Sequence, residues 1–276
     1  MRNKFIGIFD SGFGGLNILR GILKELPEYD YVYLGDTARV PYGNRSKETI
    51  FEFTRQAMDF LFQNDCQLII LACNTASADA LRKLQQEYLP ENYPDKKILG
   101  VIIPTAEEAI FKTKNNKIGV LATEATVKSK AFEREITKLN PGIKIYQNAC
   151  PLLVPIVESG EHETAIADIV LRKYLQSLLE KNIDTLILGC THYEAMENKI
   201  KEIVGGKIEV ISESEIIARK LKNYLARHSE MESKLSKKSK QIIYTTDLTD
   251  RFIRLGGEFL GREIAAEKIS ITKNNL

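Results

Sequence analysis

Two cysteines are the residues of this chain whose positions best suit chemistry. Cys73 follows the apolar run LIIL at residues 68–71, and Cys190 follows the run TLILG at residues 185–189. Short apolar runs rich in β-branched residues predict buried strands. In open α/β sheets, ligands bind at the carboxyl ends of the strands. We therefore expect each thiol to lie at a sheet edge where a small molecule could bind.

The residues after Cys73 predict the start of a helix beside this thiol. Thr75 or Ser77 could serve as the N-cap, and Asn74 adds an amide at the same point. A helix is expected to begin just after Cys190 as well. Because a helix N-terminus favours negative charge, it lowers the pKa of a thiol from its ordinary value of about 8.5. We therefore expect both cysteines to have partial thiolate character.

Each thiol is also expected to have a neighbour that can hold a proton. His192 lies two residues after Cys190 and can shuttle the proton of that thiol. Asp10 ends the strand pattern KFIGIF at residues 4–9, so it belongs at the same sheet edge as Cys73. If two halves of the chain face each other, a small ligand between them meets an acid/base group on either side.

Four classes of function are compatible with these residues, and two of them use the thiols directly. The first is a cofactor-free racemase or epimerase, in which one thiolate removes a proton from carbon and the opposite thiol returns one. That reaction needs two groups of similar strength. The second is a metal site, because thiolate and imidazole ligands suit zinc, although no usual zinc spacing occurs here. Its ligands would be Cys73, Cys190, His192 and Asp10.

The other two classes bind a ligand without changing it. The segment GFGG at residues 12–15 could bind a nucleotide or phosphate, but the third glycine of the dinucleotide fingerprint would fall at Asn17. Asp10 beside this segment would also repel phosphate. A non-catalytic amino-acid-binding module would fit two α/β domains with a cleft between them. Such a module has no need of paired thiols.

Composition argues against several classes of partner. The 276 residues include 39 basic and 37 acidic side chains, a balance that gives no sign of a nucleic-acid or anionic-membrane partner. The apolar runs are far shorter than the ~20 residues that a membrane span needs. The first residues, MRNKFIGIFDSG, lack the pattern of a signal peptide. Four cysteines without a C-x-x-C pair do not make a disulfide framework, so we expect a cytoplasmic protein with reduced thiols.

Strand patterns alternate with helical patterns along most of the chain, which predicts α/β domains with doubly wound parallel sheets. The series also repeats itself. Three landmarks recur at offsets of 112, 114 and 117 residues: Ile6-Gly7 at Ile118-Gly119, Val40-Pro41 at Val154-Pro155, and Cys73 at Cys190. A nearly constant offset predicts two halves of similar topology.

Three segments carry local predictions of their own. Ser46 is expected to open a long helix. Residues 76–88 are expected to form one helix. The polar segment at residues 226–241 is expected to be an exposed linker or a solvated helix.

Five motifs resemble those of the bacterial glutamate racemases, a family within the aspartate/glutamate racemase superfamily. They occur in the family's order between Ile6 and Tyr193: IGIFDSGFGGL, LGDTARVPYG, ACNTAS, PLLVPIVESG and GCTHY. Any one of these motifs would be weak evidence, but five in the same order are highly specific.

The resemblance implies a fold and a domain organisation. It implies two flavodoxin-like domains with doubly wound parallel sheets, related by pseudo-twofold symmetry, with the active site between them. The chain would cross back from the second domain to the first. Residues 1–97 plus 208–276 would then form a discontinuous first domain, and residues 98–207 would form the second.

The resemblance also implies a reaction. L-glutamate and D-glutamate would be interconverted by thiol/thiolate transfer of the α-proton, with no pyridoxal phosphate, other cofactor or metal. D-glutamate would supply peptidoglycan synthesis in a bacterial cytoplasm. The substrate would be the small molecule glutamate, the protein would be a homodimer, and there would be no nucleic-acid or membrane partner. Aspartate racemase activity is the alternative, because the same scaffold serves a substrate one methylene shorter.

Residue roles follow from the resemblance, position by position. Cys73 would act on the α-proton of D-glutamate with the assistance of Asp10. Cys190 would act on that of L-glutamate with the assistance of His192 and Glu158. The substrate-binding residues would be Asp10, Ser11, Tyr42, Gly43, Asn74, Thr75, Thr191 and His192.

One pair of residues departs from the family's pattern. Ser212-Glu213 stands where relatives often carry Asp-Ser. Because this pair lies outside the five motifs, it casts doubt on local hinge or interface details rather than on activity.

Overall fold

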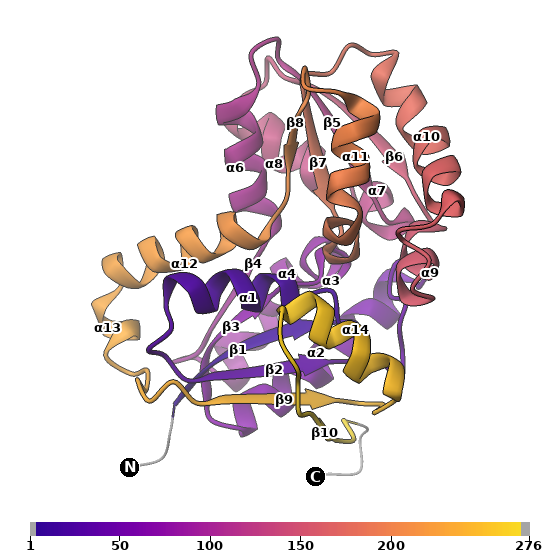
Figure 1. The fold of residues 1–276 in the computed structure, drawn as a ribbon. Coiled ribbons are helices and arrows are strands. Elements are labelled where there is room, and N and C mark those ends of the chain that lie inside the picture. Colours follow the sequence, from indigo (N-terminus) through magenta and orange to yellow (C-terminus); the bar gives the residue numbers. More distant parts are fainter. Residues whose placement is uncertain (1–3, 272–276) are drawn as a thin grey trace.

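Apolar runs form the strands of two separate sheets, and all the strand pairs are parallel. The computed structural model describes residues 4–271. Figure 1 shows one lobe around each sheet, with helices packed against both faces of the sheets. The predicted α/β class with doubly wound parallel sheets is confirmed.

The first sheet takes its strands from both ends of the chain, in the order β10-β9-β2-β1-β3-β4. Its first run of elements is β1 (Phe5–Asp10), α1 (Leu16–Glu25), β2 (Tyr31–Gly35), α2 (Lys47–Gln63), β3 (Cys66–Leu71), α3 (Asn74–Asp79), α4 (Leu81–Lys83), the π-helical turn η1 (Leu84–Tyr88), α5 (Leu89–Asn92) and β4 (Lys97–Gly100).

The second sheet is continuous in sequence and has the order β6-β5-β7-β8. Its elements are α6 (Ile102–Lys112), β5 (Lys117–Ala122), α7 (Glu124–Ser129), α8 (Ala131–Leu139), β6 (Lys144–Ala149), α9 (Leu153–Glu158), α10 (Ala165–Leu179), β7 (Thr185–Gly189), the 3-10 helix η2 (Thr191–Met196), α11 (Glu197–Val204) and β8 (Glu209–Ile211).

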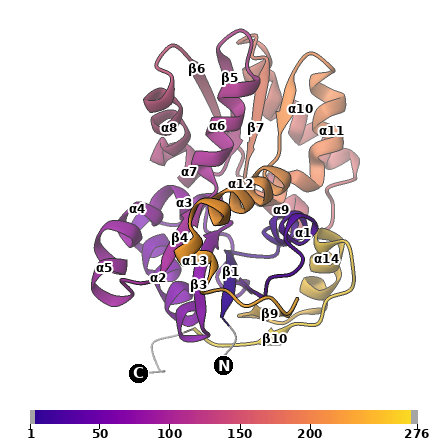
Figure 2. The same ribbon diagram turned by 90° about the vertical axis from the view of Figure 1, so that its left-hand side faces the viewer.

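The chain then returns to the first lobe. Helix α12 lies at the junction of the two lobes, where it packs on α1 and α6 (Figure 1 and Figure 2). The returning elements are α12 (Ser214–Arg227), α13 (Ser229–Glu232), β9 (Gln241–Thr245), α14 (Asp250–Leu260) and β10 (Glu267–Lys268).

The two sheets share a four-strand arrangement. The order β2-β1-β3-β4 in the first corresponds to β6-β5-β7-β8 in the second. This equivalence agrees with the repeat offsets in the sequence, because it pairs β1 with β5 and β3 with β7. Only the first sheet is extended, by β9 and β10 on the β2 side.

Strand pairing shows where the predicted domain boundaries fall in the two sheets, but it does not test whether the two domains are separate units of folding. The boundary after residue 97 falls within β4, which pairs with β3 of the first sheet. The boundary before residue 208 places β8 with the first domain, although β8 pairs with β7 of the second sheet. The division into 1–97 plus 208–276 and 98–207 stays a prediction.

Two local predictions are wrong. Residues 76–88 do not form one regular helix, because α3 ends at Asp79 and a short α-helix and a π-helical turn follow. The polar segment 226–241 is not simply exposed. Met231 and Leu235 are buried, and Asp30 Oδ1 accepts hydrogen bonds from the backbone N–H groups of Lys238 and Lys240. These contacts tie the segment to the first lobe.

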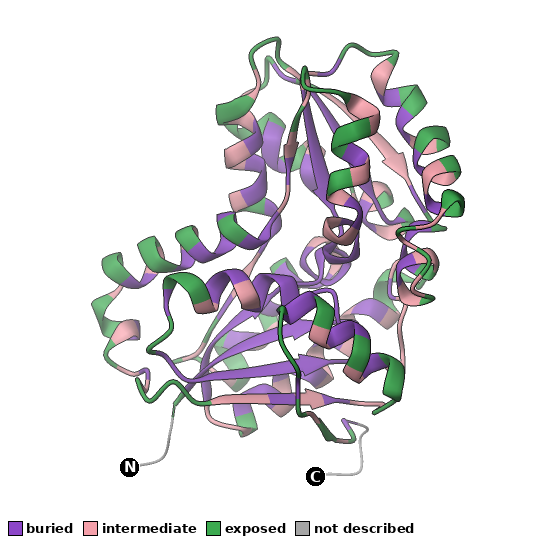
Figure 3. Ribbon diagram, viewed as in Figure 1, coloured by how far each residue is buried: buried purple, intermediate pink, exposed green. Residues whose placement is uncertain are grey.

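The central strands β1, β2, β3, β5 and β7 are buried on both faces and are purple in Figure 3, whereas strands nearer the sheet edges, such as β6 and β9, are only half-buried. In β1, Ile6 and Ile8 pack in a cluster with side chains of α1, α12 and α14, whereas Phe5 and Phe9 pack in another with side chains of α2. Successive strand side chains point to opposite faces, so apolar residues at every position are what a two-sided sheet needs.

No helix within residues 4–271 combines the length and apolar character required to cross a membrane.

Candidate active site

Cys73 follows β3 at the carboxyl edge of the first sheet. Its side chain is buried, and its thiol lies 3.5 Å from the hydroxyl oxygen of Ser11, which follows β1. Cys73 itself is the N-cap of α3, so the expectation that Thr75 or Ser77 caps this helix is wrong. Ser77 instead donates its hydroxyl to the carbonyl oxygen of Leu71 at 2.8 Å. The helix therefore begins directly at the thiol.

Cys190 occupies the corresponding place after β7 in the second sheet. Its Sγ lies 3.9 Å from Nδ1 of His192. The other ring nitrogen, Nε2, lies 3.0 Å from Oε1 of Glu158 at the end of α9. The ring of Phe13 packs against the imidazole with 5.2 Å between ring centroids. Cys190, His192 and Glu158 thus form one connected chain of polar groups.

Asp10 joins the two sheet edges. Its side chain is fully buried at the end of β1, and its Oδ2 accepts from the backbone N–H of Gly12 at 2.9 Å. Its Oδ1 accepts from the hydroxyl of Thr191, at 3.1 Å, in the segment after β7. A carboxylate from the first lobe is therefore hydrogen-bonded beside the thiol of the second.

The glycine-rich segment serves this close contact between lobes. A Cβ atom at Gly14 would lie 2.5 Å from Oγ1 of Thr191 and 2.9 Å from Nδ1 of His192. Only a residue without a side chain fits at this distance. The segment approaches the second lobe, which gives these glycines a packing role that does not involve phosphate.

Most of the predicted site residues line one small cavity. All of them line it except Asp10 and Glu158, and Thr123 and Val154 of the second lobe also contribute. Its volume is about 20 Å³. That space is enough for about one water molecule. A dicarboxylic amino acid therefore enters only if the lining residues move apart.

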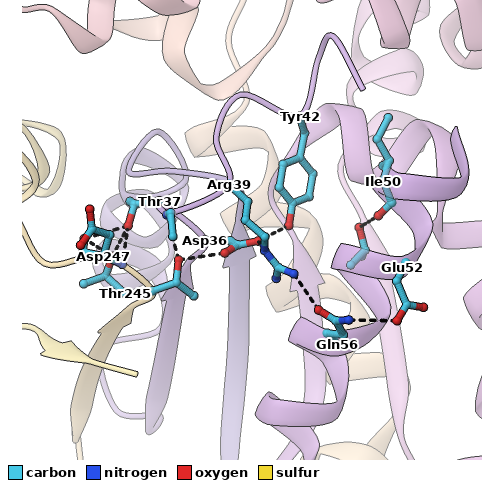
Figure 4. A network of polar contacts seen from close by, with 12 residues as sticks. Asp36, Thr37, Arg39, Tyr42, Ile50, Glu52, Gln56, Thr245 and Asp247 are labelled. Carbon is cyan, nitrogen blue, oxygen red and sulfur yellow. Dashed lines mark hydrogen bonds and ion pairs between the residues drawn. The ribbon is translucent and has the colours of Figure 1, made fainter. Parts of the chain in front are cut away.

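Tyr42 shapes this cavity with its ring, because its hydroxyl is already engaged (Figure 4). The hydroxyl donates to Oδ2 of the buried Asp36 at 2.5 Å. Arg39 Nε donates to the same oxygen at 2.6 Å, and Thr246 donates to the other at 2.8 Å. The network holds the loop after β2 in place, and the cis peptide bond between Val40 and Pro41 lies within that loop.

Thr123 is a cavity residue that the sequence analysis missed. Its hydroxyl lies 2.9 Å from the hydroxyl of Thr75, so the two lobes meet there. It also lies against Gly43, where a Cβ atom would be 2.6 Å from its own Cβ. A signal for it did exist, because Thr123 stands 112 residues after Ser11 and matches the offset of the first strands.

Glu213 is the second residue that was missed. It lies outside the five motifs, where its departure from the family's pattern concerns only hinge or interface details, yet its Oε2 accepts from Nδ2 of Asn74 at 2.8 Å. Asn74 lies next to Cys73 and lines the cavity. No pattern in the sequence connects the two residues, which are 139 positions apart.

Burial dominates the electrostatics of both thiols. It raises the pKa of Cys73 to about 12, with a further contribution from Asp10, although Ser11 acts in the opposite direction. Burial also raises the pKa of Cys190, against the effect of His192. The expectation of partial thiolate character is therefore wrong for the unliganded protein. The N-terminal position of Cys73 does lower its pKa through the N–H of Ala76, but too little to offset desolvation.

The two proton-holding neighbours are shifted as well. Burial alone would lower the pKa of His192, but hydrogen bonds to Cys190 and Glu158 raise it well above its ordinary value. Burial raises the pKa of Asp10, and His192, the N–H groups of Gly12 and Gly15, and Thr191 partly offset this. The hydrogen bonds to Cys190 and Glu158 therefore favour the protonated form of the imidazole.

The geometry gives no support to the metal hypothesis for Cys73, Cys190, His192 and Asp10. Among residues 4–271, no group of three or more His, Cys, Asp or Glu side chains is arranged to hold a metal ion.

A larger cavity, about 520 Å³ in volume, lies elsewhere at the junction of the lobes. Residues from α6, α8 and α12 line it, and neither Cys73 nor Cys190 does. The thiol chemistry therefore belongs to the small cavity.

Comparison with known families agrees with this site. The family model described as Asp/Glu/Hydantoin racemase matches residues 14–221. A glutamate racemase from Geobacter metallireducens is 40% identical over 261 residues, which cover 95% of this chain and 94% of the relative. One from Aquifex aeolicus is 41% identical over 259 residues, with 94% and 95% covered.

Solved structures resemble the whole chain. A glutamate racemase isoform from Bacillus anthracis has a TM-score of 0.89 and 34% identity, with 98% of each chain covered. The glutamate racemase of Francisella tularensis in complex with D-glutamate has a TM-score of 0.87 and 35% identity, with 98% and 99% covered. An aspartate racemase from Picrophilus torridus is only 20% identical, with a TM-score of 0.55, 81% of this chain and 95% of that chain covered, and shares the fold alone.

Proposed function

The chain belongs to the Asp/Glu/hydantoin racemase family, and we propose that it interconverts L-glutamate and D-glutamate by moving the α-proton between Cys73 and Cys190. One observation carries the proposed roles. Thiols from two different lobes line one small cavity, and each has a different proton-holding group beside it.

The proton moves across the cavity from one face of the substrate to the other. With D-glutamate bound, the Cys73 thiolate takes the α-proton, so the C–H bond breaks, an S–H bond forms, and the electron pair stays on the α-carbon. The Cys190 thiol then gives its proton to the opposite face and becomes a thiolate. L-glutamate reacts by the same steps in reverse.

The free enzyme cannot ionise Cys73 unaided. A thiol with a pKa of about 12 costs about 7 kcal/mol to ionise at neutral pH. The α-ammonium group of the substrate is the positive charge that can offset this cost when the cavity closes around it. Asp10, beside Cys73, is the base that accepts the thiol proton.

Cys190 has a different kind of support. The His192 imidazolium stabilises the thiolate that Cys190 becomes after it gives up its proton, and Glu158 holds the imidazolium in place at 3.0 Å. Both thiols thus have a partner suited to one stage of the proton transfer.

Neutral donors suit a site that accepts both enantiomers. Hydroxyl groups of Ser11, Thr75, Thr123 and Thr191 line the cavity, whereas no arginine or lysine of the described chain does. We propose that these hydroxyls and the Asn74 amide bind the two carboxylates and the ammonium. Such preorganised donors also stabilise the negative charge that develops as the α-proton leaves.

Racemisation of glutamate without an added cofactor is the direct test. Purified protein incubated with L-glutamate should bring the optical rotation to zero, and in D₂O the product should carry deuterium at the α-carbon. Aspartate in a parallel reaction should be converted much more slowly. Stable optical rotation over hours at high enzyme concentration would refute the proposal.

We further propose a biological setting and an assembly. The product supplies peptidoglycan synthesis in a bacterial cytoplasm. The four free cysteines of the described chain support a reducing compartment of this kind. The protein forms a homodimer. Rescue of a bacterial strain that needs D-glutamate for growth tests the first point, and sedimentation at twice the mass of the chain tests the second.

A further inference from the structure

Glu213 is a buried carboxyl group that the reaction described above does not use. It stands at the N-terminus of α12, where the chain leaves the second sheet, and its residue is 3% exposed. Its two oxygens contact side chains of two other elements, Asn74 of α3 and Thr105 of α6. A carboxyl group rarely occupies such a position unless it is hydrogen-bonded.

The contact with Asn74 fixes the direction of an amide in the cavity. Nδ2 of Asn74 donates to Oε2 of Glu213 at 2.8 Å. Oδ1 of the same amide is buried and has no hydrogen-bond partner among residues 4–271. Because Asn74 lines the cavity beside Cys73, this oxygen is left to accept a hydrogen bond from a ligand.

The contact with Thr105 leaves Glu213 able to carry a proton. The Thr105 hydroxyl lies 2.7 Å from the carbonyl oxygen of Val101 and 3.1 Å from Oε1 of Glu213. One hydroxyl has a single proton, and the shorter contact takes it. A proton on Oε1 of Glu213 satisfies the longer contact. Oε2 is then a carbonyl-type oxygen that can only accept.

The charges around Glu213 favour the same protonation state. Glu194 of η2 and Asp10 of β1 are the charged groups that face it, and both are acidic. Burial, together with these two carboxyl groups, raises the pKa of Glu213 to about 8, although the hydrogen bonds to Asn74 and Thr105 act in the opposite direction. Asn74 and Thr105 complete its surroundings without charge.

We propose that Glu213 is a positioning residue, whose protonated carboxyl group turns the Asn74 amide so that Oδ1 faces the cavity and accepts from the α-ammonium of the amino-acid substrate. The inference rests on the proposed function, since it concerns the same cavity.

Two substitutions at Glu213 separate the hydrogen bonds from the charge. Glu213→Gln keeps an acceptor for Asn74 and a donor for Thr105, whereas Glu213→Met keeps only the approximate volume. We expect Glu213→Met to raise the KM for both glutamate enantiomers about tenfold, with a smaller effect on kcat, and Glu213→Gln to restore the KM. Glu135→Met is the matched control, because Glu135 is also buried but bonds Arg82 and Arg134 and does not line the cavity that contains Cys73 and Cys190.

The pH profile supplies a readout that a merely structural role would not move. Above about pH 8, wild-type Glu213 ionises beside Asp10, which makes the Cys73 thiolate harder to form. The ratio of wild-type to Glu213→Gln kcat/KM should therefore be constant below about pH 7 and fall at least about twofold by pH 9.5.

Stability gives a second measure that does not depend on turnover. Since the folded-state pKa exceeds the ordinary value of 4.5, the Glu213 proton stabilises the fold fully below pH 4.5, and that contribution is lost as pH rises to about 8. The difference in the free energy of unfolding, Glu213→Gln minus wild type, should therefore increase over this pH range and stay constant above it. This measurement also shows whether Glu213→Met is folded.

The outcomes distinguish the two proposals. A KM unchanged in folded Glu213→Met, a KM raised equally in Glu213→Gln, or a pH-independent stability difference each overturns the role of Glu213. If Glu213→Met does not fold, the kcat/KM ratio and the stability difference decide. Wild-type protein that does not racemise glutamate overturns the proposed function instead, and the stability difference still reports on the protonation of Glu213.

Discussion

The two thiols share a cavity, but their chemical environments differ. Cys73 has a hydroxyl and a buried carboxyl group beside it, whereas Cys190 has an imidazole tied to a second carboxylate. A racemase has to work in both directions, so unlike environments must still give thiols of comparable strength. Burial achieves part of this, because it raises the pKa of both.

Removal of either thiol should stop racemisation but not every proton exchange. In Cys190→Ala, Cys73 can still remove and return a proton on the same face of D-glutamate. We expect racemisation to fall at least about 10³-fold, with measurable α-hydrogen exchange of D-glutamate in D₂O. Cys73→Ala should retain exchange of L-glutamate only. NMR of each enantiomer measures the exchange, and racemisation by a Cys190→Ala protein would contradict the two-base scheme.

The protonation of His192 should depend on Glu158. The chain contains three histidines, so their titrations can be followed separately by NMR. In Glu158→Gln the raised pKa of His192 should move down towards its ordinary value of 6.5, because one of its two raising partners is gone. The His192 contribution to stability would then be lost at lower pH than in wild type. Glu163→Gln, an exposed change near Lys199, is the control.

At the scale of elements, the carboxyl ends of β1, β3, β5 and β7 bring the site together. A polar residue ends each strand or follows it within two positions, and the parallel order of each sheet places these residues at one edge. Two glycines then allow the edges to meet, since a side chain at Gly14 or Gly43 would collide with threonines of the opposite lobe.

Gly43→Ala should therefore impair closure of the cavity. Its new Cβ would lie 2.6 Å from Cβ of Thr123, an atom that cannot rotate away. We expect a rise of about tenfold or more in the KM for glutamate, with little loss of stability in the open form. Gly206→Ala is the matched control, because nothing lies within 4 Å of the position its Cβ would take. Equal KM values in the two variants would contradict this account.

Much of this arrangement could be predicted from the sequence, for a physical reason. Cys73 and Cys190 follow buried strands, and the period of apolar residues reports such strands directly. The offset of 112 residues even pointed to Thr123. Glu213 could not be found in this way, because its contact with Asn74 depends on how α12 packs across the junction. The thiol pKa values were mispredicted because desolvation, which no local motif reveals, outweighs the helix N-terminus.

At the scale of the whole molecule, the two lobes share one apolar cluster, although each lobe also has a cluster of its own. One apolar cluster contains Ile8 and Ile70 of the first sheet together with Leu121 and Leu188 of the second. The opening that substrate entry requires must therefore occur at the cavity side while this shared cluster stays packed. The cavity volume of about 20 Å³ is that of the conformation before this opening.

A shared core predicts that the two lobes unfold together. Urea unfolding followed by far-UV and near-UV circular dichroism should give coincident single transitions. The near-UV signal comes from tyrosine and phenylalanine, because the chain has no tryptophan. Two resolved transitions would show that the lobes are independent and would contradict the prediction.

The origin of β9 has a consequence for the order in which the protein can assemble during synthesis. The second sheet needs only residues up to Ile211, whereas the first waits for β9 and β10 near the C-terminus. Until the ribosome has released those last strands, β2 is an unprotected edge, open to pairing with another nascent chain. The lobe that is translated first is thus the last to be completed, and the second lobe can be finished before it.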